Sequence, residues 1–187
     1  MTTMIANFLR ENGAFMFSKD GFQTKSGKIY PFETDLRNSI QTWKNAQELA
    51  YLILTELKDI IAPDSLILGV PETGSILAFL VNGVRGGDFP INMIRSVPKE
   101  YQKETQYTVL PLDPTKHLIV IEDDVVSGTT LIQYLTILKN MGAKNVNVVS
   151  VIDREEITDG KSVRERVEDL GYYYKFLVGS EDIHERT

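Results

Sequence analysis

Residues 117–130 read HLIVIEDDVVSGTT and carry the strongest structural signal in the chain. The run from Leu118 to Ile121 is apolar at every position, which predicts a strand that is buried on both faces. An acidic segment follows directly, and a Ser-Gly-Thr-Thr turn then leads into a helix predicted from Thr129 to Met141. A buried strand that passes through a polar turn into a helix is typical of a parallel α/β sheet.

The same alternation continues on both sides of this stretch. Helices are expected from Trp43 to Ile61, from Ser75 to Asn82 and from Lys161 to Leu170. Strands are expected at Leu66 to Val70, Ile91 to Ile94, Leu118 to Ile121 and Val146 to Ile152, with a last strand over YYYKFLV at residues 172–178. Apolar strands that alternate with helices predict an α/β fold, with a central parallel sheet flanked by helices, over residues 41–187.

The first 40 residues follow a different pattern. Aromatic and β-branched residues are interleaved there with glycines and Pro31, which indicates short strands and turns. We therefore expect residues 1–40 to form a small N-terminal hood on the 41–187 core. The length of 187 residues fits one structural domain overall.

Composition excludes several classes of protein. The net charge of −6 argues against a broad nucleic-acid interface, and the absence of cysteine excludes disulfides and thiolate zinc sites. The two histidines lack metal-ligand spacing, so a histidine-based zinc site is not expected. The apolar runs are far shorter than a membrane span, and the first residues do not resemble a signal peptide. We expect a soluble, cytoplasmic protein without nucleic-acid or membrane partners.

The turn after the 118–121 strand has the composition of an anion-binding loop. Ser127, Thr129 and Thr130 offer hydroxyl groups, and Gly128 allows the backbone to approach a ligand closely. The free amides at the start of the next helix favour a phosphate group. A plainer interpretation is that these residues only cap the helix.

An acidic pair, Glu122 and Asp123, stands at the end of the same strand. Carboxylates do not bind an anion, but they suit sugar hydroxyls or a Mg²⁺ ion. The alternative is that both acids are simply solvated. Because a ribose 5-phosphate unit offers hydroxyls and a phosphate together, it fits the whole segment.

The segment VIEDDVVSGTT, residues 120–130, resembles the phosphoribosyl-diphosphate (PRPP) signature of the type I phosphoribosyltransferases. The resemblance implies that Glu122 and Asp123 hold the ribose 2′ and 3′ hydroxyls, with Asp123 also catalytic, and that both acids meet Mg²⁺ indirectly through PRPP. It also implies that the following loop wraps the 5′-phosphate through Ser127, Gly128, Thr129 and Thr130.

Further segments resemble the orotate phosphoribosyltransferases in particular. Residues 22–32 contain Lys25, which would reach the substrates, and Phe32, which would flank the pyrimidine. Residues 153–155 read Asp-Arg-Glu, and the resemblance implies that Arg154 meets the orotate carboxylate; a surface ion pair is the alternative role. Val126 occupies a base-binding position where many members of this family have threonine, so the identity of the base stays open.

The loop LGVPETG, residues 68–74, resembles the family segment that receives pyrophosphate through backbone amides. Gly69, Thr73 and Gly74 would provide these amides because small residues allow close approach. Glu72 in the same loop is an acid beside an expected anion, and the sequence assigns it no role.

Residues 95–101, RSVPKEY, resemble the mobile catalytic loop of the family. Arg95 and Lys99 match its cations, which would bind PRPP and stabilise the pyrophosphate charge that develops in the transition state. Ser96, Tyr101 and Gln102 depart from the family pattern. Residues 100–107 form a polar stretch that suits a lid, or else an ordinary surface loop. In the family this loop reaches the neighbouring subunit, so the resemblance implies a homodimer.

The sequence therefore predicts a phosphoribosyltransferase that uses Mg²⁺-bound PRPP and transfers its phosphoribosyl group to orotate. Two alternatives remain at this point. One is a transferase for another base, such as a purine, and the other is a regulator that senses PRPP without catalysis.

Overall fold

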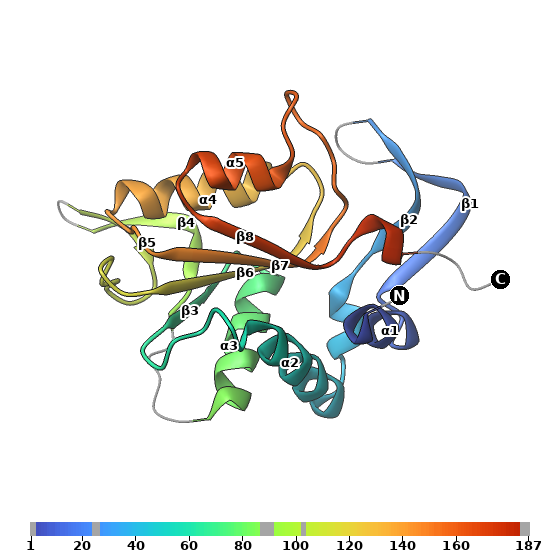
Figure 1. Cartoon of the computed structure of the whole chain (residues 1–187), viewed down its shortest axis with the longest axis horizontal. Helices are drawn as coiled ribbons and strands as arrows, with labels where there is room; N and C mark the ends of the chain where they lie inside the picture. Colours follow the sequence, from blue (N-terminus) through green and yellow to red (C-terminus); the bar gives the residue numbers. More distant parts are fainter. Residues whose placement is uncertain (1–2, 24–26, 87–91, 102–103, 184–187) are drawn as a thin grey trace.

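The computed structural model describes the backbone of residues 3–23, 27–86, 92–101 and 104–183, and their side chains except for those from 96 to 106. A four-stranded parallel sheet lies at its centre, as the sequence predicts (Figure 1). Its strands, in spatial order, are β3 (Leu66–Gly69), β6 (Leu118–Val125), β7 (Val146–Asp153) and β8 (Tyr173–Val178).

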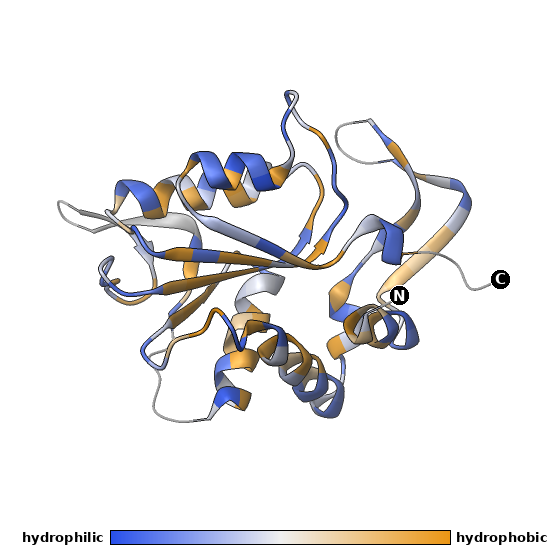
Figure 2. Cartoon of the chain, in the orientation of Figure 1, coloured by the Kyte–Doolittle hydropathy of each residue, from blue (hydrophilic) through white to orange (hydrophobic). Residues whose placement is uncertain are grey.

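Helices cover both faces of the sheet. α2 (Trp43–Leu57) and α3 (Thr73–Arg85) lie on one face, and α4 (Thr129–Asn140) and α5 (Val163–Asp169) lie on the other (Figure 1). Figure 2 shows the apolar sides of α4 and α5 turned toward the sheet and their polar sides turned outward. This arrangement follows from the strands, which are apolar on both faces and need cover on each.

Alternate residues of β6 enter two separate cores. Ile119 and Ile121 of β6 pack with α2 and α3, whereas Leu118 and Val120 pack with α4 and α5. This division follows from the strand geometry, in which successive side chains point to opposite faces. Among the described residues, no helix is long and apolar enough to cross a membrane.

The N-terminal region contains a helix that the sequence pattern did not predict. α1 (Met4–Glu11) precedes the expected antiparallel hairpin of β1 (Phe15–Gln23) and β2 (Ile29–Thr34), and the short helix η1 (Leu36–Ile40) follows. Thr3 caps α1 by accepting a hydrogen bond from the Ala6 amide.

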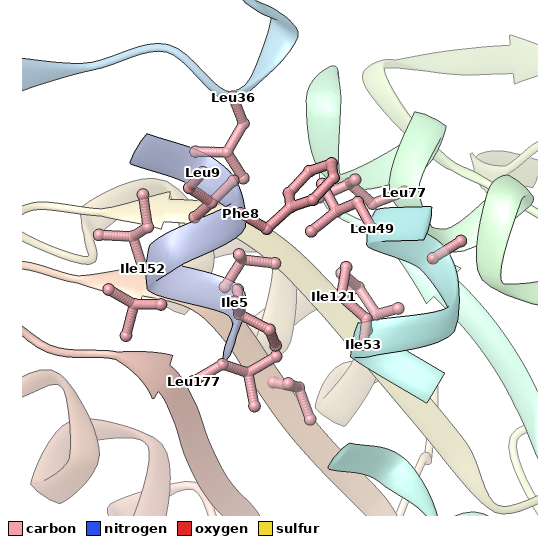
Figure 3. Packing of buried hydrophobic residues seen from close by; sticks show 14 of the residues in the cluster. Ile5, Phe8, Leu9, Leu36, Leu49, Ile53, Leu77, Ile121, Ile152 and Leu177 are labelled. Carbon is pink, nitrogen blue, oxygen red and sulfur yellow. The ribbon is translucent and has the colours of Figure 1, made fainter. Parts of the chain in front are cut away.

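The apolar face of α1 belongs to the main core rather than to a separate hood. Figure 3 shows Phe8 of α1 pointing toward Leu49 of α2 and Leu77 of α3. Ile152 of β7 and Leu177 of β8 complete the same cluster. Through α1, the described part of the N-terminal region contributes to the same core as the sheet and its helices.

The strand expected at Ile91 to Ile94 is not a member of the parallel sheet. Ile91 lies outside the described residues, and β4 (Ile94–Tyr101) instead pairs antiparallel with β5 (Glu104–Thr108). The described part of the 100–107 stretch, predicted as a loop, thus belongs to a β-hairpin. An apolar run as short as residues 91–94 carries no information about its partner strand, which explains the wrong prediction.

Two glycines of the chain differ sharply in the space around them. A Cβ atom on Gly69, at the end of β3, would lie 2.1 Å from the Gly74 carbonyl oxygen, whereas a Cβ atom on Gly83 of α3 would meet nothing within 4 Å. We expect Gly69→Ala to lower the free energy of unfolding by about 3 kcal/mol, because backbone must move. The matched control Gly83→Ala should raise it by about 0.5–1 kcal/mol through helix propensity. Urea unfolding of both variants checks this, and equal effects would contradict it.

Candidate active site

The acidic pair lies where β6 leaves the core. Glu122 is buried and Asp123 is half-buried, and the Glu122 Oε1 atom accepts a hydrogen bond of 3.2 Å from the Asp123 amide. Burial, together with the neighbouring Asp123 carboxyl group, raises the pKa of Glu122 to about 10. Burial therefore favours the protonated form of Glu122, whose carboxyl group can donate as well as accept a hydrogen bond, for example with a sugar hydroxyl.

A cavity of about 150 Å³ opens beside this pair, over the turn that the sequence predicts as a phosphate loop. Its lining consists of Glu122 and residues 124–131, and so includes Val126, Ser127, Gly128, Thr129 and Thr130. Asp123 is not part of the lining.

The backbone of this turn is suited to an anion. Gly128 adopts a left-handed conformation with φ of 70° directly before α4, and it provides no side-chain cap for the helix. The Ser127 and Thr129 hydroxyl oxygens lie 3.1 Å apart at the same helix start. The cavity thus combines hydroxyl groups with the positive end of a helix.

α5 supports the turn from the side. Arg166 Nη1 donates a hydrogen bond of 2.6 Å to the Ser127 carbonyl oxygen. Val163 packs so closely on Gly128 that a Cβ atom there would lie 2.7 Å from a Val163 methyl group. The sequence predicts a helix over Lys161 to Leu170 but no contact with the turn, so sequence reasoning missed both contacts.

The second expected anion loop joins β3 to α3. Thr73 and Gly74 form the first turn of α3, and among the described residues Glu72 at the N-cap makes no capping hydrogen bond with its side chain. A Cβ atom on Gly74 would lie 2.5 Å from the Ile121 carbonyl oxygen of β6. In this structure the glycines at 69 and 74 are explained by the close approach of two chain segments, a reason that differs from the predicted contact with a ligand.

Arg37 of η1 is a cation near the site that the sequence did not single out. Its side chain pairs with Asp35 at 2.8 Å, and this pairing is the main reason why the pKa of Arg37 is raised. The charges of Asp123 and Glu72 act in the same direction. Arg37 is therefore an exposed cation whose ion-pair partner is Asp35.

Arg154 follows the end of β7 and is held by three kinds of contact. Its Nη2 atom lies 2.6 Å from Asp124 Oδ2, and its Nε atom lies 3.3 Å from Asp124 Oδ1. Nη2 also donates to the Thr34 hydroxyl at 2.7 Å. The guanidinium carbon lies 5.6 Å from the Tyr30 ring centre and 5.5 Å from that of Phe32. Arg154 and Phe32 are thus brought together, as the sequence resemblance implies, although Phe32 itself is buried.

The β2 strand and the residue before it contribute further groups that sequence reasoning missed. The Tyr30 hydroxyl donates to Glu156 Oε2 at 3.1 Å, and Lys28 forms an ion pair of 2.7 Å with the same buried carboxylate. Burial and the bond to Glu156 raise the pKa of Tyr30, so its hydroxyl stays protonated. These contacts join β2 and the residue before it to Glu156, which follows β7.

The expected catalytic cations lie only partly within the described structure. Arg95 on β4 lines a second cavity of about 540 Å³, together with Pro71, Glu72 and residues of α3. Its Nε atom donates to the Thr108 carbonyl at 3.1 Å. Lys99 lies on β4 opposite Gln106 of β5, but its side chain is outside the described part, as are the side chains of Ser96 and Tyr101. Lys25 and Gln102 lie outside the described residues altogether.

No family model matches the chain. Its curated relatives include the orotate phosphoribosyltransferase of Methanopyrus kandleri, which is 26% identical over 179 residues, covering 96% of this chain and 90% of the relative. Among solved structures, orotate phosphoribosyltransferase of Francisella tularensis superposes with a TM-score of 0.74 at 22% identity, covering 96% of this chain and 84% of that one. Adenine phosphoribosyltransferase of Leishmania donovani gives a TM-score of 0.68 at 14% identity, covering 98% and 83%.

The chain has the type I phosphoribosyltransferase fold. The resemblance that the sequence motifs indicate is therefore confirmed at the level of the fold. Within this phosphoribosyltransferase fold, the edge formed by the carboxyl ends of β3, β6 and β7 carries the two expected anion loops and Arg154. Ligands bind at this edge in open parallel sheets in general.

The high pKa of Glu122 leads to a stability prediction for this phosphoribosyltransferase fold. The unfolded chain loses the Glu122 proton near pH 4.5, whereas the folded chain keeps it up to about pH 10. Stability contributed by this group is complete below pH 4.5 and is lost as the pH rises toward 10. We therefore expect Glu122→Gln, which resembles the protonated form, to raise the melting temperature at pH 7 by about 2–4 °C.

The pH dependence isolates this effect. Asp124 and Asp153 also have raised pKa values because they are buried, but they titrate alike in both proteins and cancel in the difference. The difference in melting temperature between Glu122→Gln and the unmodified protein should widen from pH 5 to pH 9. Calorimetric scans across this range check it, and a difference that is constant with pH would contradict it.

Proposed function

We propose that the protein transfers the phosphoribosyl group of PRPP to orotate, releasing pyrophosphate and forming orotidine 5′-monophosphate, a step in pyrimidine synthesis. The observation that carries the proposal is the juxtaposition of the 122–130 loop with Arg154 and its two aromatic neighbours at one edge of the sheet. A loop that suits a phosphate and an arginine that suits a carboxylate match the two substrates, PRPP and orotate. The names of the curated relatives and the fold support the same activity.

The reaction needs no covalent nucleophile. As the bond from C1′ to pyrophosphate loosens, positive charge grows on the ribose and negative charge grows on the leaving group. Glu122 and Asp123 would orient the ribose hydroxyls, and the 127–130 amides and hydroxyls would hold the 5′-phosphate. Arg95 and Lys99 would face the leaving pyrophosphate, near the amides of Thr73 and Gly74.

Mg²⁺ belongs to this proposal as a companion of PRPP. Among the described residues, no group of three or more His, Asp or Glu side chains could hold a metal ion. The acidic pair would meet this ion only indirectly, through PRPP, with Asp123 facing its water ligands and Glu122 holding the ribose hydroxyls. When bound, Mg²⁺ would neutralise part of the pyrophosphate charge.

A homodimer is a second part of the proposal. Apolar side chains are exposed around the 540 Å³ cavity between α3 and β4, among them Ile76, Phe79 and Met93. A contiguous apolar surface of this kind is typical of a protein interface. The partner's β4–β5 hairpin would lie near this face, because in the family the corresponding loop reaches the neighbouring subunit.

A cytoplasmic location is the last part of the proposal. PRPP is highly charged and does not cross membranes unaided, which supports this location.

An initial-rate assay with a panel of bases tests the proposal. Orotate, uracil, adenine and hypoxanthine are each mixed with PRPP, Mg²⁺ and the protein, and pyrophosphate release is measured. We expect release with orotate, together with a fall in orotate absorbance. Pyrophosphate release with a purine alone would favour the rival, a transferase for another base. Two observations support this rival: the structural similarity to an adenine phosphoribosyltransferase, and Val126 at a position where many orotate enzymes have threonine.

A regulator that senses PRPP is the remaining rival. It would bind PRPP in the 122–130 loop but release no pyrophosphate with any base. The departures at Ser96, Tyr101 and Gln102 from the family pattern favour it, whereas the net charge of −6 opposes a DNA-binding role. The Lys99 variant in the Discussion separates this rival from an enzyme.

A further inference from the structure

The carboxylate-binding side of Arg154 is already occupied by a carboxylate of the chain itself. Asp124 meets the guanidinium side-on, through Nε at 3.3 Å and Nη2 at 2.6 Å. Two parallel N–H bonds to one carboxylate form the arrangement that an arginine uses to recognise an acidic ligand. Asp124 therefore stands where the carboxylate of an acidic base would bind.

The register of the sheet produces this pair. Val125 of β6 lies beside Asp153 of β7, and the Arg154 amide continues the pairing by donating to the Val125 carbonyl at 2.9 Å. Asp124 and Arg154 are thus two positions apart in register, and such positions share one face of a sheet. Because both strands are fixed in the core, the two side chains meet whenever no ligand separates them.

The pair is shielded from water. The Arg154 and Asp124 side chains are 6% and 14% exposed. Thr34 from β2 donates its hydroxyl hydrogen to Asp124 Oδ2 and accepts from Arg154 Nη2, so it bridges the two groups. In such surroundings an unpaired charge is costly, and each partner is held by the other.

Asp124 also belongs to the phosphate cavity. It lines the 150 Å³ space together with Val126 and residues 127–130. Asp124 therefore contacts Arg154 and also borders open volume in the loop that is expected to hold the phosphate.

We propose that Asp124 is a specificity-determining residue, which occupies the carboxylate position on Arg154 and must be displaced by an acidic acceptor base. The inference rests on the proposed function, since it concerns the base that Arg154 recognises. Asp124 weakens the advantage that a carboxylate gives to a base, because a new anion replaces an existing one. A neutral base of the same ring gains nothing from the displacement.

The test compares orotate with uracil, which has the same ring but lacks the carboxylate. Each is titrated by calorimetry into protein holding ribose 5-phosphate, which fills the cradle but has no leaving group. Asp124→Asn keeps the size of the side chain and removes its charge. We expect this variant to bind orotate at least about tenfold more tightly and to bind uracil within about twofold of the unmodified protein.

A matched control accounts for the change in net charge. Asp113→Asn removes one negative charge from the segment before β6, at the opposite end of the sheet, where the Asp113 side chain accepts bonds from Thr115. It should leave orotate binding unchanged. Weaker or unchanged orotate binding by Asp124→Asn would overturn the proposal, because Asp124 would then only position Arg154.

A structure of the unmodified protein with orotate and ribose 5-phosphate gives a second test that needs no variant. The expected result is the orotate carboxylate on Arg154, with Asp124 more than about 4 Å from the guanidinium. An intact Asp124–Arg154 pair beside bound orotate would overturn the proposal. Turnover in the base panel judges the proposed function separately: orotate turnover together with unimproved Asp124→Asn binding would refute this inference alone.

Discussion

Replacing Lys99 by alanine should lower kcat for orotate by about 10²–10³-fold, while the dissociation constant of PRPP changes by less than about threefold. Lys99 lies on β4 opposite Gln106 of β5. In the proposed role it would act on the additional charge that develops as the pyrophosphate leaves, so its loss should affect the transition state more than the ground state. Steady-state kinetics and a PRPP titration measure the two quantities.

A charge-matched control completes this prediction. Lys116→Ala removes a lysine from the segment before β6, at the opposite end of the sheet, where Lys116 lies 3.9 Å from Asp64. This variant should keep both kcat and PRPP affinity. If Lys99→Ala alters only PRPP binding and no base is turned over by the unmodified protein, the chain is a PRPP sensor rather than an enzyme.

Replacing Arg154 by lysine should lower kcat/KM for orotate by about 100-fold. Lysine keeps the positive charge that the buried Asp124 requires, but it cannot form two parallel hydrogen bonds with a carboxylate. The loss should appear mainly in KM for orotate, because the contact exists before the reaction as well as during it. KM for PRPP should stay within about threefold, since the 122–130 cradle is intact.

Arg164→Lys is the matched control for this prediction. Arg164 of α5 also lies over two aromatic rings, those of Tyr174 and Phe176, and donates to the Tyr174 carbonyl at 2.9 Å. Its replacement should affect stability slightly and leave KM for orotate unchanged. Equal kinetic losses in both variants would show that Arg154 acts through packing rather than through recognition of the base.

The central part of the fold was predictable because its signals are local. The apolar run of β6, the Ser-Gly-Thr-Thr turn and the periodicity of α4 lie in one continuous segment, and the structure places all three as expected. α1 was missed because it spans barely two turns, although Ile5, Phe8 and Leu9 follow helical spacing. The β4–β5 hairpin was missed because strand pairing is a non-local property.

In the candidate site, too, the local features were predictable from the sequence and the non-local contacts were not. Residues of the phosphate loop come from one segment and could be named from the sequence, and the structure gathers them around one cavity. Arg166, Tyr30 and Thr34 form hydrogen bonds with residues that are 39 to 126 positions away in the sequence, and no sequence motif predicts these contacts. The Asp124–Arg154 pair depends on the register between β6 and β7, which a single sequence does not reveal.

We expect residues 122–130 to bind the phosphorylated ribose of PRPP. A crystal structure of the protein with PRPP and Mg²⁺ is the decisive experiment. The 5′-phosphate should lie within hydrogen-bond distance of the amides of residues 127–130, and the ribose hydroxyls should lie on Glu122 and Asp123. A phosphate bound elsewhere, with this cavity still holding only water, would contradict it.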